Sequence, residues 1–514
     1  MPIGGYNTSA MDGNVTLHQL PLFPDAAETG SLRRVSFSHG DVCPQEERLR
    51  LEARYAGYLE ESRRFNRKSV SFQGNKGSIV HSWIKYREGF SAQLVESLIH
   101  EFGLQPGDTL LDPFSGSATT LLVAKSLGID AVGIELMSVC HLTWDAKSHF
   151  QEYDLDELSR VRELLASSRP ADSGVTFPHI RITRGAFSPE TERDIMFYTT
   201  WVERLDVSPA TRTLLRLLLT SILEEVSYTR KDGQYLRWDY RSAKVQERNR
   251  ARLEQGRPPV KKVDFGPLPG VKQALLRAFD SVMADIRKLQ ALPFRESKQE
   301  LIRGNSLFVL PELPAARFDG VITSPPYCNR YDYTRTYALE LAYLGEGDNI
   351  FALRQGLLSC TVENRPKLQV LREHYRSLGA EARFERILEV VQNNPAFREV
   401  NEALQLRWQR GDMNNRGVLR MVEQYFTELT FIFAEIYRTS KSGARVAFVN
   451  DNVRYGGEVI PVDLLTTDLA VRLGFEPLKV YVLPQRKGNS SQQMGKFGRE
   501  ALRKSITIWR KPHA

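Results

Sequence analysis

Cysteine is scarce in this chain. The 514 residues include four cysteines, Cys43, Cys140, Cys328 and Cys360. They are scattered and form no Cys-x-x-Cys pair, so the sequence suggests neither a disulfide framework nor a metal site of the zinc type. No apolar run reaches the ~18 residues that a membrane-spanning helix needs. The N-terminus also lacks the charged-then-apolar pattern of a secretory signal. We therefore expect a protein of the reducing cytoplasm, with no membrane partner.

Two common nucleotide-binding signatures are missing as well. The chain contains neither a Gly-x-Gly-x-x-Gly phosphate loop nor a Walker-type Gly-Lys-Ser/Thr sequence. Internal repeats and long low-complexity tracts are absent too. Hydrophobic residues make up 41% of the chain, which is enough for a core. The length allows one elaborated catalytic domain or two to three domains.

The strongest pattern that is present lies between residues 109 and 135. A predicted strand, TLLD, ends at Asp112, a turn of small residues follows, and a helix begins near Thr119. A second predicted strand, at 130–135, ends in Glu135. In a doubly wound sheet such a turn lies where ligands bind, and an acidic residue about 20 positions further on can accept hydrogen bonds from ribose hydroxyls. Without a phosphate loop, this cradle suits a nucleoside that carries no phosphate.

A second motif, Ser324-Pro325-Pro326-Tyr327, follows the apolar run 318–323, which predicts a short buried strand. Two prolines cannot continue a helix or a central strand, so they stiffen a turn and fix the directions of its carbonyl oxygens. The serine hydroxyl and these carbonyls offer acceptors for an exocyclic NH2 group. The tyrosine ring offers a flat face on which a base can stack.

Together the two motifs resemble those of DNA amino-methyltransferases. The sequence Asp-Pro-Phe-x-Gly-x-x-Thr at 112–119 is similar to the S-adenosylmethionine motif of that family, and Ser-Pro-Pro-Tyr is similar to its catalytic motif. The resemblance covers roughly residues 78–150 and 300–512. It implies an α/β fold, a Rossmann-like, doubly wound methyltransferase sheet with large helical insertions. It also implies S-adenosyl-L-methionine as the cofactor.

The resemblance assigns site residues. The catalytic residues would be Ser324, Pro325, Pro326 and Tyr327. A Phe-Ser pair that touches the methionine end of the cofactor corresponds to Phe90 and Ser91, and Ser91 also suits the N-cap of a helix at 92–102. The polar residue near the adenine corresponds to Asn305, where the family usually has an acid. The expected cofactor-binding residues are Phe90, Ser91, Asp112, Phe114, Gly116, Ser117, Thr119, Glu135 and Asn305.

The turn also suggests the chemistry. Hydrogen bonds from the target NH2 to the Ser324 hydroxyl and the Pro325 carbonyl would favour a pyramidal nitrogen with a free lone pair. Tyr327 would stack on a base flipped from the duplex. No covalent intermediate is needed. A carbon-5 cytosine methyltransferase needs a nucleophilic thiol, usually in a Pro-Cys pair, and the chain contains no such pair.

The first residue of the catalytic motif bears on the target base. In the family, Ser goes mostly with N4 of cytosine, whereas Asp or Asn goes mostly with N6 of adenine. We therefore predict methylation of cytosine N4 in duplex DNA, in a bacterial or archaeal restriction-modification or related defence system with a cognate restriction endonuclease. Adenine N6 of DNA and a base of RNA stay open as alternatives. A DNA-binding protein on a decayed methyltransferase fold is disfavoured by the two intact motifs.

Positive charge concentrates between residues 230 and 262. This stretch holds eleven Lys and Arg and four Asp and Glu, a difference of +7 against a net charge of +8 for the whole chain. Tyr235, Trp238 and Tyr240 are interleaved. Basic side chains bind phosphates and aromatic rings stack on exposed bases. The expected nucleic-acid contacts are Arg230, Lys231, Arg237, Arg241 and Lys244, with a solvated loop as the alternative.

The motifs divide the chain into six segments. The first three are a poorly ordered arm at 1–60 leading into a helix at 45–64, the cofactor-binding half of the methyltransferase domain at 61–150, and a helical insertion at 151–300 that contains the basic segment 226–262. The next two are the catalytic strand and turn at 301–345, with a helix at 331–344, and a helical insertion at 346–417, the candidate for target recognition. The last is the C-terminal part of the sheet at 418–514, with a helix at 418–437 and strands at 443–449, 478–483 and 505–509. The cofactor motif precedes the catalytic motif, the reverse of the commonest order, so the chain looks like a permuted relative.

Overall fold

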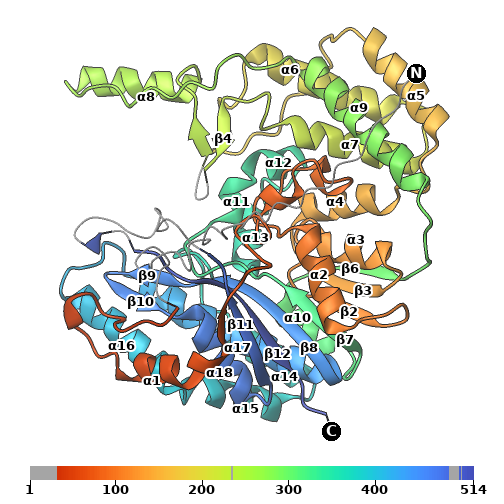
Figure 1. Cartoon of the computed structure of the whole chain (residues 1–514). Coiled ribbons are helices and arrows are strands. Elements are labelled where there is room, and N and C mark those ends of the chain that lie inside the picture. Colours follow the sequence, from red (N-terminus) through yellow and green to blue (C-terminus); the bar gives the residue numbers. More distant parts are fainter. Residues whose placement is uncertain (1–31, 233–235, 485–496, 499, 514) are drawn as a thin grey trace, which may run out of the picture.

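An eight-stranded sheet forms the centre of the molecule (Figure 1). The structure, a computed structural model, describes residues 32–232, 236–484, 497–498 and 500–513. The strands, in their order across the sheet, are β1 (Leu59–Glu61), β11 (Glu476–Val482), β12 (Lys504–Arg510), β8 (Ser440–Asp451), β7 (Phe318–Thr323), β2 (Thr109–Asp112), β3 (Asp130–Glu135) and β6 (Gln299–Arg303). Neighbouring strands are parallel, except that β12 is antiparallel to both β8 and β11. The predicted α/β class with a doubly wound, Rossmann-like sheet is confirmed.

Alternate residues of the central strands face two separate cores. Leu110 and Ile322 pack into the core on one face of the sheet, whereas their neighbours Leu111 and Val321 pack into the core on the other. Strands buried on both faces read as continuous apolar runs. That is why the strands at 109–112, 130–135 and 318–323 were predictable from the sequence.

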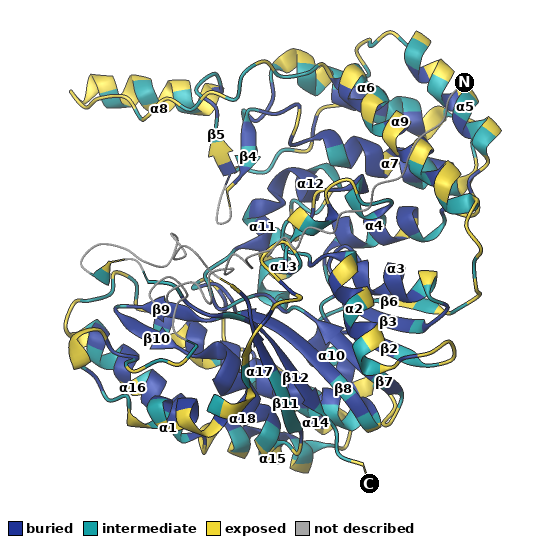
Figure 2. Ribbon diagram, in the orientation of Figure 1, coloured by how far each residue is buried: buried dark blue, intermediate teal, exposed yellow. Residues whose placement is uncertain are grey.

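Helices cover both faces of this sheet (Figures 1 and 2). One core includes residues of α2 and α3, and the other includes residues of α10, α17 and α18. The predicted amphipathic helix 418–437 is α17. The helices of the sheet domain are α1 (Glu46–Tyr55), α2 (Ala92–Phe102), α3 (Thr119–Ser126), α4 (Ser138–Ser148), α10 (Ser306–Glu312), α11 (Tyr333–Thr336), α12 (Ala338–Tyr343), α13 (Ile350–Gly356), α14 (Leu368–Ser377), α15 (Glu381–Gln392), α16 (Pro395–Gln409), α17 (Gly417–Thr439) and α18 (Val462–Arg472).

A second, mainly helical lobe, residues 151–298, stands above the sheet domain in Figure 1. Its helices are α5 (Leu155–Ser167), α6 (Pro189–Arg204), α7 (Pro209–Ile222), α8 (Ala243–Glu254) and α9 (Val271–Gln290). The apolar stretch predicted to be buried lies mostly in α7, whose Leu214, Leu217 and Leu218 are at most 1% exposed. An antiparallel pair, β4 (Thr229–Lys231) and β5 (Leu236–Trp238), interrupts the helices. A similar pair in the sheet domain is β9 (Val453–Tyr455) and β10 (Glu458–Ile460).

Two secondary-structure predictions were wrong in detail, and one strand was not predicted. The helix expected at 45–64 ends at Tyr55, and residues 59–61 form β1, because their backbone pairs with Val480–Val482 of β11. The helix expected at 331–344 is broken at Tyr337 into α11 and α12. Strand β6 was missed because this edge strand has no buried residue and therefore no apolar run.

Residues 1–31 of the expected N-terminal arm lie outside the described residues, as does Tyr235. The remainder of the arm is described and includes α1. Over the described part of the chain, no helix combines the length and the apolar character needed to span a membrane.

Candidate active site

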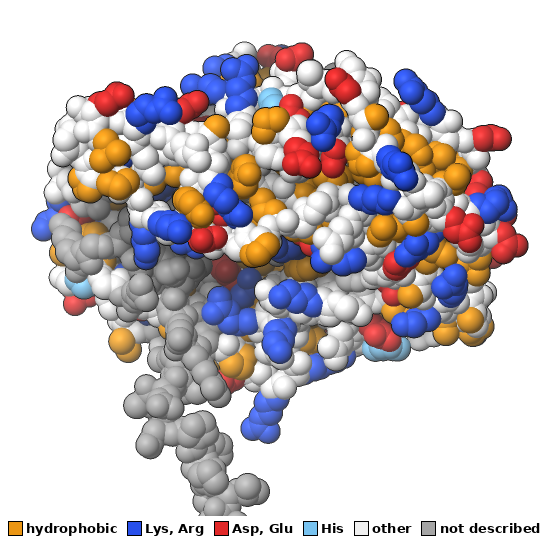
Figure 3. All heavy atoms as spheres, turned by 90° about the horizontal axis from the view of Figure 1, so that it is seen from above, with side chains coloured by type: hydrophobic (Ala, Val, Ile, Leu, Met, Phe, Trp, Pro, Cys, Tyr) orange, Lys and Arg blue, Asp and Glu red, His pale blue; other side chains and the backbone are white. Residues whose placement is uncertain are grey.

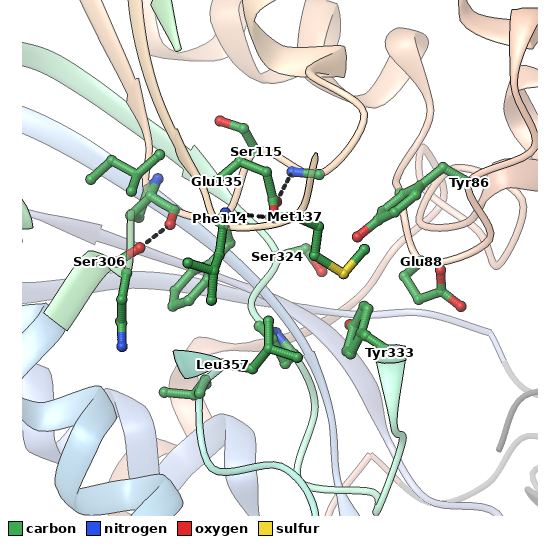
Figure 4. A pocket seen from close by; sticks show the side chains of 18 of the residues that line it. Tyr86, Glu88, Phe114, Ser115, Glu135, Met137, Ser306, Ser324, Tyr333 and Leu357 are labelled. Carbon is green, nitrogen blue, oxygen red and sulfur yellow. Dashed lines mark hydrogen bonds between the residues drawn. The ribbon is translucent and has the colours of Figure 1, made fainter. Parts of the chain in front are cut away.

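A cavity of about 710 Å³ lies at the carboxyl ends of the central strands (Figure 4). The chain leaves β2 toward β3 and β6 on one side and leaves β7 toward β8 on the other, so β2 and β7 flank the switch point of the sheet. Ligands of open α/β sheets bind in the crevice at such a point. Six of the nine sequence-predicted cofactor residues line this first cavity: Phe90, Phe114, Gly116, Thr119, Glu135 and Asn305. The other three, Ser91, Asp112 and Ser117, are buried and do not line it.

Asp112 holds the turn that forms the floor of this cavity. Its carboxylate accepts hydrogen bonds from the hydroxyls of Thr120 (2.6 Å) and Thr323 (2.7 Å) and from the backbone N–H of Phe114 (3.1 Å). The side chain is 1% exposed, and burial raises its pKa to about 6 against the opposing effect of these donors. Asp112 therefore ties the cofactor motif to the end of β7, the strand that leads into the catalytic turn.

Glu135, at the end of β3, faces the cavity and organises the loop around it. One carboxylate oxygen accepts the N–H of Gly116 (2.8 Å), and the other accepts the N–H groups of Leu136 (2.8 Å) and Met137 (2.9 Å). Burial raises its pKa to about 7, although the three backbone donors oppose that shift. A carboxylate held in this way keeps lone pairs available for the hydroxyls of a ligand.

The small-residue turn brings its backbone close to an aromatic ring. Gly116 has φ +50°, and a Cβ atom at this position would lie 2.7 Å from Cε1 of Tyr86. Glycine is therefore required both by the backbone conformation and by the available space. Ala118, with φ +61°, adopts the left-handed conformation directly before α3. The result is a tight turn whose backbone lies open to the cavity.

Asn305 and Ser306 close one end of the cavity. The Asn305 Oδ1 atom caps α10 by accepting the N–H of Leu307 at 2.9 Å. Within the described part of the chain, the buried Nδ2 atom of Asn305 has no hydrogen-bond partner. The Ser306 hydroxyl donates to the carbonyl of Pro113 and joins the ends of β6 and β2. An unused amide donor in a cavity wall is suited to an acceptor atom on a ligand.

Phe90 and Ser91 lie at the start of α2 and differ in their surroundings. Phe90 lines the cavity. The Ser91 hydroxyl instead accepts the N–H of Leu94 at 3.2 Å, and the predicted N-cap is confirmed.

The Ser-Pro-Pro-Tyr turn, predicted to be catalytic, separates the first cavity from a second one. Ser324 and Pro326 line the first cavity, whereas Pro325 and Tyr327 line the second, which has a volume of about 740 Å³. The hydroxyls of Ser324 and Tyr327 lie 3.1 Å apart. The turn thus places these two hydroxyls together at the boundary between the two cavities.

Four residues that the sequence analysis did not single out complete this region. Glu88 and Tyr333 line both cavities, and Tyr331 and Lys504 line the second. Figure 4 shows Glu88 and Tyr333 at the end of the first cavity that lies away from Ser306. Tyr331 and Tyr333 could have been predicted, because they lie in a Tyr-rich segment directly after the Ser-Pro-Pro-Tyr motif. Lys504 could not, because it lies in β12, far from the motif in the sequence.

Polar contacts organise the wall of the second cavity. The Glu88 carboxylate accepts hydrogen bonds from the hydroxyls of Tyr331 and Tyr337, and burial raises its pKa. The Lys504 ammonium lies 4.9 Å from the ring centroid of Tyr327 and 3.1 Å from Oδ1 of Asp451. Burial raises the pKa of Tyr327, although the Lys504 charge opposes this shift. The second cavity therefore combines aromatic faces with charged donors and acceptors.

Comparisons with known proteins fit this geometry. A family model described as DNA methylase matches residues 60–143. The type II methyltransferase M.BsoBI of Geobacillus stearothermophilus is 55% identical over 480 residues, covering 93% of this chain and 94% of that protein. This chain belongs to the DNA methylase family. The type II methyltransferases M.AvaI of Nostoc sp. and of Anabaena variabilis are each 37% identical over 466 residues, covering 90% of this chain and 92% of each protein.

The predicted relationship to DNA amino-methyltransferases is confirmed by these matches, and the methylase family implies S-adenosylmethionine as the methyl donor. The crystal structure of TrmN from Thermus thermophilus aligns over 86% of this chain and 53% of that chain at 10% identity. The TM-score of this alignment is 0.24.

Three of the five basic residues expected to contact DNA are engaged inside the methylase. Lys231 is 5% exposed, and its ammonium lies 2.5 Å from a carboxylate oxygen of Glu340. Arg230 donates to the carbonyl oxygens of Ser227 (3.0 Å) and Thr229 (2.7 Å). Arg241 forms a two-point contact with Asp239 at 2.8 and 2.9 Å. These side chains organise the β4–β5 pair and its junction with α12.

The other two basic residues are accessible. Arg237 is 55% exposed and lies 4.0 Å from Asp232, at the limit of an ion pair. Lys244, at the start of α8, is exposed and lies 4.3 Å from the ring centroid of Trp238. Their charges face solvent at the edge of the helical lobe.

Proposed function

We propose that this methylase transfers a methyl group to the exocyclic N4 of cytosine in duplex DNA, as the modification enzyme of a restriction-modification system. The observation that carries the proposal is the Ser-Pro-Pro-Tyr turn at the switch point, with Ser324 facing one cavity and Tyr327 facing the other. Serine in the first position of this turn favours cytosine N4 over adenine N6.

The first cavity fits S-adenosylmethionine. Glu135 would accept hydrogen bonds from the ribose hydroxyls, and the free amide donor of Asn305 would bind an acceptor on the adenine. Gly116, whose N–H donates to Glu135, would allow the methionine part to approach the backbone near Phe90. When bound, this cofactor supplies an electrophilic methyl group on a sulfonium. The absence of a phosphate loop agrees with a ligand that carries no phosphate.

The second cavity fits a flipped base. Tyr327 and Tyr331 offer aromatic faces, and Pro325 lines the same cavity. Base–aromatic stacking contributes ~1–3 kcal/mol per base. The base would enter from the side of Tyr327 and present its amino group at Ser324, where the two cavities approach each other.

The chain's own groups position the amine. The Ser324 hydroxyl and the Pro325 carbonyl would accept hydrogen bonds from its two N–H groups, so that the nitrogen becomes pyramidal and its lone pair points toward the first cavity. Alignment of the two reactants supplies much of the acceleration. No nucleophilic side chain is required.

The first test is product analysis. The protein is incubated with tritiated S-adenosylmethionine and mixed-sequence duplex DNA, which is then digested to nucleosides and separated. We expect label in N4-methylcytosine. Label in N6-methyladenine would overturn the base assignment and leave DNA methylation standing. Label only in an RNA control would move the function to RNA.

A further inference from the structure

We propose that α8 lies in the major groove of duplex DNA, on an arm that it forms together with the segment that returns along it, residues 243–262. This inference rests on the proposed function only in taking duplex DNA as the substrate. We call residues 243–262 the arm.

The arm lacks the packing that stabilises the other long helices of this chain. None of the twelve residues of α8 is buried, and Leu253 is 61% exposed. Figure 2 shows α8 as exposed and intermediate along its whole length. Isolated helices of about 12 residues are marginal in water, because most helical stability comes from packing of one face. A binding partner would supply the contacts that the fold does not.

The arm is nevertheless a built element with fixed ends. The buried Ser242 caps α8 by accepting the N–H of Val245 at 3.3 Å. The returning segment is held to the helix by hydrogen bonds from Arg252 Nε to the Pro258 carbonyl (2.7 Å) and from the Val260 N–H to Asn249 (2.9 Å). At the base, the N–H of Tyr240 donates to the carbonyl of Val263 at 2.9 Å. The arm therefore projects from an anchored base.

The net positive charge of the arm favours binding to a polyanion. Its seven basic residues are Lys244, Arg248, Arg250, Arg252, Arg257, Lys261 and Lys262, against two acids, Glu247 and Glu254. Lys244, Arg248 and Arg252 are spaced four residues apart and share one face of the helix. Like charges at this spacing destabilise an isolated helix, so the stripe favours a bound phosphate chain.

The size and position of the arm suit a groove of duplex DNA. A helix of 12 residues is about 18 Å long at ~1.5 Å per residue. The major groove of B-DNA, about 12 Å wide, admits one α-helix. In Figure 1 the arm projects from the helical lobe on the side where β9 and β10 lie in the sheet domain. That side of the sheet domain adjoins the predicted catalytic motif, because Tyr455 of β9 donates a hydrogen bond at 2.7 Å to the carbonyl of Cys328, the residue after the motif.

Two variants test the arm. The first changes Lys244→Ala, Arg248→Ala and Arg250→Ala together and leaves Arg252, which holds the returning segment. The second replaces residues 243–262 by two glycines, which the Tyr240–Val263 hydrogen bond allows. A matched control changes three exposed basic residues elsewhere in the same lobe: Arg160→Ala, Arg287→Ala and Lys288→Ala. Binding of a mixed-sequence duplex is followed by fluorescence anisotropy at several salt concentrations, and S-adenosylmethionine binding is followed by calorimetry.

We expect both arm variants to bind the duplex at least tenfold more weakly, with a salt dependence reduced by about one unit of slope per lost phosphate contact. Cofactor affinity and the control variant should match the parent protein. Unchanged duplex affinity and unchanged slope in both arm variants would overturn the proposal. Failure of the parent protein itself to bind duplex DNA would overturn the proposed function and the arm together.

A second measurement distinguishes the groove from the backbone. The duplex is prepared with 7-deazaguanine at every guanine, which removes an acceptor in the major groove and leaves the phosphates intact. The parent protein should bind this duplex more weakly than the ordinary one, and the protein without the arm should bind the two equally. An arm that contributes to affinity but ignores the substitution would contradict the major-groove assignment.

Discussion

At the scale of single residues, the first cavity is organised by carboxylates that bind the backbone and neighbouring hydroxyls. Asp112 joins β2 to β7 through Thr120 and Thr323, and Glu135 fixes Gly116 and the loop after β3. Both carboxyls have raised pKa values because they are removed from water. Their charges are therefore available near neutral pH and above.

Replacement of Asp112 should abolish useful cofactor binding. Asp112→Ala leaves two hydroxyls and one backbone N–H without their acceptor, and hydrogen bonds to a charged group contribute about 1.5–3 kcal/mol each. We expect at least a hundredfold weaker binding of S-adenosylmethionine in calorimetry. Asp112→Asn, which keeps one acceptor oxygen, should lose less cofactor affinity than Asp112→Ala. An alanine variant with the parent affinity would refute the role of this residue.

Cofactor binding should weaken as the pH falls through about 7. The raised pKa of Glu135 means that its carboxyl takes up a proton as the pH falls through that value, and each bound proton removes an acceptor for the ribose hydroxyls. Calorimetry between pH 6 and 8.5 measures the effect. In Glu135→Gln the affinity should be lower and nearly independent of pH across this window. An equally steep profile in that variant would assign the titration to another group.

Tyr327 should matter for turnover and not for the cofactor. Its ring lines the second cavity and not the first. Tyr327→Ala should therefore retain cofactor affinity and lose most methyl transfer, because stacking of a flipped base contributes ~1–3 kcal/mol. Tyr327→Phe, which keeps the ring, should retain more activity. Near-normal turnover of the alanine variant would place the base elsewhere.

At the scale of elements, the helical lobe is joined to the catalytic segment by buried charge. Lys231 of β4 pairs with Glu340 of α12 and lies 4.3 Å from the ring centroid of Tyr337. The Tyr337 hydroxyl in turn donates to Glu88 beside the active site. The β4–β5 pair thus has a structural connection to the cavity wall as well as to the arm.

Loss of this charge should affect stability more than DNA affinity. Lys231→Met removes the partner of a buried carboxylate, which typically lowers the free energy of unfolding by about 3–5 kcal/mol. Urea denaturation measures the change, and the double variant Lys231→Met with Glu340→Leu should recover part of it. Because Lys231 is buried, duplex affinity of the folded variant should stay close to that of the parent. A large loss of duplex affinity without a loss of stability would reverse this assignment.

The second helical insertion has a clear packing role. Helices α14–α16 bury Leu371, Phe384 and Leu404 in the same core as α17. That residues 346–417 also read the bases stays a prediction. Their exposed faces are available for such contacts, but the arm carries the stronger concentration of positive charge.

At the scale of the whole molecule, charge is dispersed over the face viewed from above, with Lys and Arg side chains interspersed among acidic ones (Figure 3). The two cores hold three of the four thiols, Cys140 and Cys360 on one side of the sheet and Cys328 on the other. All four cysteines are at most 6% exposed, and none is in a disulfide. Burial raises the pKa of each thiol.

Thiol labelling should therefore report global unfolding. The reactive species is the thiolate, and a buried thiol of raised pKa supplies little of it. We expect almost no reaction with a thiol reagent in the native protein at pH 8 and four thiols after denaturation. Fast reaction of one native thiol would indicate local opening around it. Labelling along a urea gradient then gives the unfolding transition directly.

The sequence by itself determined the sheet centre and the two motifs. Apolar runs buried on both faces marked β2, β3 and β7, and the breaks at Pro113, Gly116 and Pro325 marked the turns at their ends. These features are local, because they depend on the residue types within one strand and the turn that follows it. The relationship to DNA methylases also followed from these residues.

Only the tertiary structure decided which side chains share a cavity and which charges are free. Lys504 reaches the catalytic turn because β12 lies beside β8, and Ser91 serves a helix cap instead of facing the cavity. Lys231 was predicted to contact phosphate, but in the structure it is buried and paired with Glu340. Burial and ion pairing depend on residues distant in the chain. A local pattern of charge therefore identifies a basic segment but not which of its members face the solvent.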